Sequence, residues 1–290
     1  MPVTYEVASS SLVNPDKTGR KTGLFYFSIS SKKSLQESQF NDDCFDTELN
    51  MRLLYFLYRP FLYTIFPIGF VFMTFVSFFS SIFLGEKRGR KIILLYNNFT
   101  AFMMRMTIIT EGIENYDRTK SYVVVANHKS NADPIILWAS LNADILWVMK
   151  SELLKIPVFG FIMKRLGNMG IDRKNSKKAI ASIGEAKKRL TKGTCVGFFP
   201  EGTRFHGNEI GPFKKGAFHF ASELGLPILP VSISGSEKII PPRSIFVHYG
   251  KVKAVIHPPV NVTETSAADL NAVAEKVRKT IEAGFTPDYE

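Results

Sequence analysis

The sequence predicts an α/β protein: a mixed, mostly parallel sheet flanked by helices, with an N-terminal membrane-embedded helical hairpin. Two observations lead to this prediction. From about residue 116 onward, short apolar runs alternate with helical patterns, as in folds whose parallel strands are joined by helices. Ahead of that region lies a long uncharged stretch that is rich in Phe. The 290 residues are enough for one large domain or two smaller ones.

The strands and helices of the α/β region follow from its apolar periodicity. Helices are indicated where apolar residues recur at helical spacing: Ser176–Leu190, Gly216–Leu224 ending at Gly225, and Ser266–Ala283 with Ser266 as its cap. The triplet Tyr249-Gly250-Lys251 resembles a hairpin turn, so we expect one antiparallel pair in the sheet. The predicted strands are Tyr122–Ala126, Ile145–Met149, Met169–Asp172, Thr194–Phe199, Ile228–Ile233, Ile245–Tyr249 and Val252–Ile256.

The apolar region has the composition of a membrane anchor. Phe61–Leu84 contains 24 residues without a charge, which is long enough to cross a hydrocarbon core, although Pro67 interrupts it. The basic segment EKRGRK at 86–91 follows, and a second apolar stretch runs over Ile92–Ile109. Basic residues beside a membrane segment mark the cytoplasmic side. We favour a two-helix monotopic anchor; a spanning segment and a helical hairpin buried in a soluble core are the alternatives.

These patterns divide the chain into three parts. Residues 1–48 are polar, carry a net charge of −2 and show no sustained periodicity, so we expect a loosely ordered extension. No apolar core follows a short basic start, so a secretory signal is not predicted. Residues 49–112 are the expected membrane-anchoring helices, and residues 113–290 the α/β domain.

Charge and cysteine content narrow the function classes. The net charge of +11 and the pI near 9.5 favour an anionic partner: nucleic acid, an acidic membrane surface or a phosphorylated substrate. Only Cys44 and Cys195 are present, far apart in the sequence, which excludes a disulfide framework and a Cys-rich zinc site. A reducing, cytoplasmic setting fits this composition.

The segment VVVANHKSNADP at 123–134 holds the candidate catalytic pair. A predicted strand ends at Ala126, His128 follows directly, and Asp133 precedes Pro134, where it is well placed to be the N-cap of a helix. On one helix or one strand, side chains five residues apart diverge, but across a turn they can meet. An imidazole held by a carboxylate is a general base. The alternative is a surface histidine beside an ordinary helix cap.

Further charged residues follow other predicted strands, at the edge where an α/β fold binds its ligands. Lys150 follows one strand and Arg173 another. The segment GFFPEGTRF at 197–205 turns sharply after a third strand, which fixes Glu201, exposes backbone N–H groups around Gly202 and Thr203, and presents the Arg204 fork, suited to phosphate. Taken singly, each cation is as well explained by a solvated charge, and the turn by an ordinary loop.

Four blocks in this order give a resemblance to a known family. They are NHKSNAD at 127–133, GIDR at 170–173, FPEGTR at 199–204 and PILPVSI at 227–233. The chain resembles the lysophosphatidate (1-acylglycerol-3-phosphate) acyltransferases, glycerolipid acyltransferases of the NHxxxxD type, over roughly residues 115–260. One departure is Phe205, where many members carry a serine; we expect little consequence from it.

The resemblance implies an activity and a role for each site residue. His128 would take the proton from the sn-2 hydroxyl of lysophosphatidate as it attacks an acyl thioester, giving phosphatidate, and Asp133 would orient the imidazole. Lys150 and Arg204 would hold the acceptor phosphate with Arg173 as a further helper, while Glu201 and Gly202, with Thr203 beside them, would position the glycerol. The resemblance implies no cofactor beyond acyl-CoA or acyl carrier protein as co-substrate, a membrane lipid acceptor, and an active site on the cytoplasmic face of a membrane.

Other functions stay open at the level of sequence. Another lysolipid, such as a lysophospholipid or a lyso-ornithine lipid, would keep the chemistry and change the acceptor. A non-catalytic lipid-binding protein would leave the His–Asp pair without a purpose. A nucleic-acid-binding module would explain the charge but not the apolar segment. A metal hydrolase lacks a third ligand near His128 and Asp133 in the sequence.

Overall fold

The computed structural model describes the α/β region and the helices just before it. All the described residues fall within one unit of the chain, residues 58–290. Arg173, one of the candidate site residues, lies outside them, as do the 1–48 extension and most of the helix expected at 176–190, of which residues 184, 187 and 188 are helical. The described residues are 68–69, 71–73, 75–171, 184, 187–188, 190, 192–205, 207–242, 244, 246–262 and 269–289.

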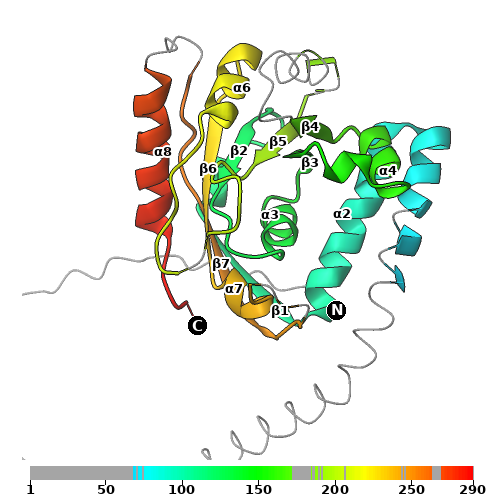
Figure 1. The fold of residues 1–290 in the computed structure, drawn as a ribbon, viewed down its shortest axis with the longest axis horizontal. Helices are drawn as coiled ribbons and strands as arrows, with labels where there is room; N and C mark the ends of the chain where they lie inside the picture. The colour runs from blue at the N-terminus through cyan, green and yellow to red at the C-terminus, as the bar shows by residue number, and fades with distance from the viewer. Residues whose placement is uncertain are drawn as a thin grey trace, which may run out of the picture. The chain divides into compact units, whose positions relative to one another are not determined.

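The described residues form a seven-stranded sheet with helices on both faces (Figure 1). Its strands lie in the order β1-β7-β6-β2-β5-β3-β4, and only β6 and β7 pair antiparallel. The strands are β1 (Met106–Glu111), β2 (Val123–Ala126), β3 (Asp144–Lys150), β4 (Met169–Ile171), β5 (Thr194–Phe198), β6 (Ile228–Ser234) and β7 (Gly250–Ile256). The predicted mixed, mostly parallel sheet flanked by helices is therefore confirmed.

Alternating side chains of the central strands build two cores, one on each face of the sheet. Val124 and Ala126 of β2 pack with helix α3 (Asp133–Leu141), while Val123 and Val125 pack with α6 (Gly216–Leu224) and α8 (Leu270–Gly284). In Figure 1, α6 and α8 cover one face, and α3 and α2 (Glu86–Met103) lie on the other. The shorter helices are η1 (Ile113–Asn115), η2 (Leu153–Lys155), α4 (Phe159–Arg165) and α7 (Ser236–Ile239).

Two predicted features near the sheet edges are wrong. The apolar stretch 92–109 is not one helix: α2 ends at Met103, and Met106–Glu111 is the edge strand β1, which pairs with the distant β7. The hairpin at Tyr249-Gly250-Lys251 is absent, because residues 246–249 have no regular structure and β7 starts at Gly250. The Ser244 hydroxyl accepts the N–H of Phe246 at 2.9 Å, a local bond that competes with strand pairing.

Helical residues 68–84, apart from 70 and 74, precede α2 and expose apolar side chains. Phe72 is 61% exposed, Phe79 53% and Phe83 79%, and on α2 Phe102 is 70% exposed. Exposed apolar surface of this extent marks a contact with another molecule or with lipid. Across the described part of the chain, no helix combines the length and apolar character needed to cross a bilayer.

Candidate active site

The predicted site residues that the structure describes gather at the carboxyl ends of three neighbouring strands. β5 lies between β2 and β3 and pairs parallel with both, so the three strands have their carboxyl ends at the same edge of the sheet. His128 follows β2, Lys150 ends β3, and the segment 199–204 follows β5. In a parallel sheet this edge is where ligands bind.

His128 and Asp133 meet across the turn after β2. The Nδ1 atom of His128 lies 2.7 Å from Oδ2 of Asp133. Because a carboxylate only accepts hydrogen bonds, this contact places the imidazole proton on Nδ1 and leaves Nε2 with a free lone pair. The predicted contact is confirmed, and Nε2 is the atom able to take a proton.

Asp133 differs from the prediction in one respect, because it is the first residue of α3 and not its N-cap. Ala132 occupies the cap position, with no side-chain cap hydrogen bond. Oδ2 of Asp133 instead accepts the N–H groups of Lys129 and Ser130, both at 2.8 Å. The carboxylate is fully buried. It accepts hydrogen bonds from the preceding loop and not from the first turn of the helix, because this loop folds back over the start of α3.

The backbone of His128 is held from two sides. The buried Glu201 accepts the His128 N–H at Oε1 (2.8 Å) and the Gly211 N–H at Oε2 (3.1 Å), and burial raises the pKa of this carboxyl above its usual range. The preceding Asn127 exchanges two hydrogen bonds with the backbone of Ile233 on β6, at 2.9 and 2.8 Å. These contacts fix where the imidazole stands relative to the sheet.

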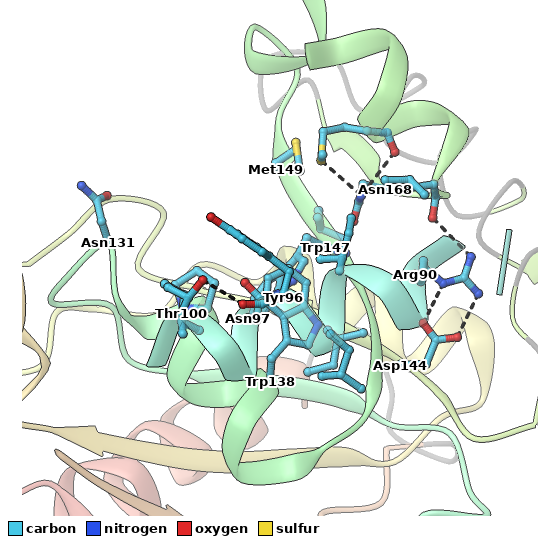
Figure 2. A pocket seen from close by; sticks show the side chains of 18 of the residues that line it. Arg90, Tyr96, Asn97, Thr100, Asn131, Trp138, Asp144, Trp147, Met149 and Asn168 are labelled. Atoms are coloured by element: carbon cyan, nitrogen blue, oxygen red, sulfur yellow. Dashed lines mark hydrogen bonds and ion pairs between the residues drawn. The ribbon is translucent and has the colours of Figure 1, made fainter. Parts of the chain in front are cut away.

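The His128 ring faces an apolar pocket. It stacks on Phe199 with ring centroids 4.1 Å apart, and Phe199 stacks in turn on Trp147 at 5.3 Å. The pocket has a volume of about 660 Å³ and is lined from α2, α3, β3 and α4, with His128, Phe199 and Gly202 in its wall. Figure 2 shows Tyr96 and Asn97 of α2, Trp138 of α3 and Trp147 among the lining side chains.

The basic segment 86–91 contributes Lys87, Arg90 and Lys91 to the wall of this pocket, and of these only Arg90 is largely buried. Arg90 forms a two-point ion pair with Asp144, at 2.6 and 2.9 Å, and donates to the carbonyl of Leu166 at 3.2 Å (Figure 2). Lys87, Arg88 and Lys91 remain exposed. The segment that looked like one basic cluster thus contributes a structural ion pair as well as a charged surface.

The other predicted residues that the structure describes line the pocket or lie beside residues that line it. Lys150 lines it and is exposed, with its Nζ 3.5 Å from Glu152. Arg204 is exposed and donates to Oδ1 of Asn131 at 2.8 Å. Thr203 is exposed, and Gly202 adopts a positive φ of 75° that favours glycine. Each carboxylate oxygen of Glu201 accepts a hydrogen bond from a backbone N–H group.

Sequence reasoning did not find several residues that build the site. Lys129 is buried beside His128. Phe205 donates its backbone N–H to the carbonyl of His128 at 2.9 Å, and its ring lies 5.7 Å from Lys129 Nζ. Phe199 supplies the ring under His128. The sequence offered one signal for Lys129, Phe199 and Phe205: each lies within or directly after a recognised block, NHKSNAD or FPEGTR. Within the described ranges, no group of three or more His, Cys, Asp or Glu side chains is arranged to hold a metal ion.

Comparisons with known proteins identify the family of this chain. The family model described as Acyltransferase matches residues 107–234. The 1-acyl-sn-glycerol-3-phosphate acyltransferase alpha of Mus musculus is 32% identical over 198 residues, which cover 66% of this chain and 70% of that protein. The chain belongs to the 1-acyl-sn-glycerol-3-phosphate acyltransferase family.

Two further proteins of this family are similar to the chain. The chloroplastic 1-acyl-sn-glycerol-3-phosphate acyltransferase BAT2 of Brassica napus is 34% identical over 58% of this chain, and the match spans about half of the plant protein (50%). The crystal structure of the 1-acyl-sn-glycerophosphate (LPA) acyltransferase PlsC from Thermotoga maritima aligns with a TM-score of 0.62 and 28% identity, covering 81% of this chain and 96% of that one.

Proposed function

We propose that the protein transfers a fatty acyl group from an acyl thioester to the sn-2 hydroxyl of lysophosphatidate, giving phosphatidate for phospholipid biosynthesis. The observation that carries this proposal is the His128–Asp133 pair, which opens onto an apolar pocket with basic side chains at its mouth. A pocket of this kind suits a substrate with a long hydrocarbon chain and an anionic head. The family membership supports the same reaction.

The mechanism follows from the free lone pair on His128 Nε2. As the acceptor hydroxyl oxygen attacks the thioester carbonyl carbon, Nε2 takes the hydroxyl proton, and Asp133 stabilises the imidazolium. When the C–S bond breaks, the imidazolium returns the proton to the departing thiolate. No enzyme nucleophile takes part: Cys195 is fully buried, and burial raises its pKa to about 11.

Recognition of the acceptor falls to the mouth of the pocket. Arg204 and Lys150 would neutralise the phosphate, with Arg173 as a further helper, and Gly202 and Thr203 would lie beside the glycerol. Glu201 would act on the acceptor indirectly, since both its oxygens already accept backbone N–H groups. The acyl donor would be acyl-CoA or acyl carrier protein, with its chain in the apolar pocket and no further cofactor.

We also propose that the helices before the sheet hold the site at a membrane, with the active site on the cytoplasmic face. The expected anchoring region, 49–112, contains the exposed apolar side chains of residues 68–84 and of α2. Exposed Lys87, Arg88 and Lys91 at the start of α2 would contact anionic lipid headgroups. An interfacial position would give the pocket access to lipid acceptors.

A panel of acceptors tests the reaction. Purified full-length protein is incubated in detergent micelles with acyl-CoA or acyl carrier protein donors and with lysophosphatidate, lysophosphatidylcholine, lysophosphatidylethanolamine or a lyso-ornithine lipid. Acylation of lysophosphatidate with the highest kcat/KM is the expected result. A higher kcat/KM for an acceptor without a phosphomonoester would favour the other lysolipid activity, and no acylation of any acceptor would refute acyl transfer.

A further inference from the structure

Lys129, directly after the proposed base, has a buried side chain with no part in the mechanism above. It is only 2% exposed. Its Nζ donates to the carbonyl of Gly207 at 2.9 Å and also to the carbonyl of Glu209. The rings of Phe205 and Phe285 lie 5.7 and 5.2 Å from Nζ, at distances where an aromatic ring attracts a cation. A buried ammonium persists only where partners of this kind surround it.

Three of these partners, Phe205, Gly207 and Glu209, belong to the loop that carries the proposed acceptor-binding residues, and the fourth, Phe285, follows α8. This loop is the segment between Phe199 and Gly211, which the structure describes except for residue 206. Two contacts hold it to His128. The N–H of Phe205 donates to the His128 carbonyl, and the Glu201 carboxylate accepts the N–H groups of both His128 and Gly211. Lys129 adds a third attachment further along, at Gly207 and Glu209. Arg204 lies within the fastened segment.

The side chains of His128 and Lys129 serve opposite sides of the sheet. Val124 and Ala126 pack on the α3 side of the sheet, and Val123 and Val125 pack on the α6–α8 side. His128 faces the pocket on the α3 side, whereas Lys129 reaches Phe285, just after α8. Lys129 does not line the pocket. The loop residues that contact Lys129, namely Phe205, Gly207 and Glu209, do not line it either, so a change at Lys129 acts on the part of the loop outside the pocket wall.

We propose that Lys129 is a positioning residue that holds the 199–211 loop, and through it Arg204, in the geometry that binds the acceptor phosphate. This inference rests on the proposed function, because the phosphate role of Arg204 is part of it. The attachment requires a cation, since both carbonyl partners and the aromatic faces present negative charge to Nζ. The ionisable groups that act on this ammonium are the carboxylates Glu201, Glu237, Asp133 and Glu209.

Burial makes this attachment sensitive to alkaline pH. Loss of hydration lowers the pKa of Lys129 below its ordinary value, although the four carboxylates oppose the shift. The charged form exists below that pKa and is lost as the pH rises through it. Arginine stays protonated throughout this range. A Lys129→Arg variant that retains the loop contacts should thus keep its acceptor kcat/KM at alkaline pH values where the wild-type value falls.

Steady-state kinetics on purified full-length variants test the proposal. Lys129→Met keeps the apolar stem and removes the charge. It should lower kcat/KM for lysophosphatidate by about a hundredfold, the order expected from a misplaced binding group, and change the KM of the acyl donor by less than about twofold. Amide hydrogen exchange in residues 205–211 should be faster than in the wild type. Lys253→Met is the matched control, because Lys253 of β7 is largely buried and pairs with Glu111 of β1 at 2.9 Å, a contact that involves no residue of the 199–211 loop.

Two more variants keep the outcome decisive. Lys129→Arg should recover most of the acceptor kcat/KM at neutral pH. Phe285→Leu should lower the same parameter by only about threefold, since it removes one ring and leaves the other contacts of Lys129 in place. If Lys129→Met does not fold, the Phe285→Leu result and the pH profile of Lys129→Arg decide.

The proposal is overturned if the folded Lys129→Met variant affects the donor and acceptor parameters equally, if it leaves both unchanged, or if exchange in residues 205–211 is unaltered. With Lys129→Met unfolded, an unchanged acceptor kcat/KM in Phe285→Leu, or the same alkaline fall in Lys129→Arg as in the wild type, overturns it. A wild-type protein that acylates no lysolipid would instead refute the proposed function, independently of Lys129.

Discussion

At the scale of single residues, His128 depends on one carboxylate oxygen for its tautomer. Oδ2 of Asp133 accepts the imidazole Nδ1 and two backbone N–H groups, while Oδ1 has no hydrogen-bond partner within the described residues. One oxygen therefore orients both the ring and the loop that carries it. A substitution that preserves the size of Asp133 but removes its charge isolates the effect of this oxygen.

Asp133→Asn should reduce kcat by roughly 10³–10⁴-fold, the loss seen when a buried carboxylate partner of a catalytic histidine becomes an amide. The amide no longer fixes the proton on Nδ1, so Nε2 is not reliably free to accept one. Initial rates with saturating lysophosphatidate and acyl-CoA measure this loss, and thermal unfolding verifies that the variant folds. A loss below tenfold in a folded variant would contradict the proposed base assignment.

Arg204→Ala should raise the KM for lysophosphatidate by about 10–100-fold, because one charge-assisted hydrogen bond is worth about 1.5–3 kcal/mol. The donor KM should stay nearly constant, since Arg204 is at the mouth and not among the pocket-lining residues. Kinetics with each substrate varied in turn separate the two constants. Equal increases in both would remove the phosphate role from Arg204. Exposed Arg118, outside the site, provides the matched control as Arg118→Ala.

The contact between His128 and Asp133 could be predicted from the sequence, whereas the burial of Lys129 could not. His128 and Asp133 are close in the chain, so a turn suffices to join them. A lysine between a histidine and a serine looks like a solvated charge. Its burial depends on Gly207, Glu209 and Phe285, which the fold brings together from far along the chain.

At the scale of elements, the helix before α2 and α2 itself approach closely at Gly89. The Ser77 hydroxyl donates to the Gly89 carbonyl at 2.5 Å, and a Cβ at Gly89 would lie 2.7 Å from Cβ of Ser81 and 2.8 Å from the Ser77 carbonyl oxygen. Only a residue without a side chain permits this separation. Since α2 also forms a wall of the pocket, the contact at Gly89 helps to set the pocket's width.

Gly89→Val should force these helices apart. Overpacking of this kind costs about 1–3 kcal/mol, which corresponds to a fall in Tm of roughly 2–12 °C for a chain of this size. The KM for the acyl donor should rise with it, because the α2 wall moves. Differential scanning fluorimetry and donor kinetics measure the two effects. Gly216→Ala is the matched control, since a Cβ there meets nothing within 4 Å; a similar loss in both variants would argue against a specific helix contact.

The elements that the sequence predicts well are those with a local signal. The central strands are apolar runs, and α6 ends at Gly225 with a positive φ of 65°, as a helix-terminating glycine should. The edge strand β1 escaped prediction because Met106–Glu111 continues the apolar pattern of α2 without a Gly or Pro between them. Its strand character comes from pairing with β7, more than 140 residues later. The periodicity of a short segment cannot reveal that it pairs with a strand far along the chain.

At the scale of the whole molecule, charge and apolar exposure coincide at the helices before the sheet. The net charge is +11, and exposed Lys87, Arg88 and Lys91 lie next to the apolar side chains of residues 68–84. An anionic bilayer would attract the charges over a distance set by salt, and the Phe side chains would then enter the interface. This arrangement predicts two independent effects on membrane binding. Added salt should weaken the electrostatic attraction, and substitution of the exposed Phe side chains should weaken the hydrophobic contribution.

The double variant Phe72→Asp/Phe79→Asp should lose at least about tenfold in affinity for anionic phosphatidylglycerol-containing vesicles, because each buried Phe contributes about 1.5–3 kcal/mol. Raising the salt concentration should weaken binding of the wild type, because it screens the exposed basic residues, and should weaken the variant by a smaller factor, because its two added carboxylates already reduce the attraction. Vesicle flotation measures both effects. Phe246→Asp is the control: Phe246 is 53% exposed, as is Phe79, but it follows α7, far along the chain from these helices. If Phe246→Asp weakens binding as much as the double variant does, the membrane-facing surface is not the one formed by residues 68–84 and α2.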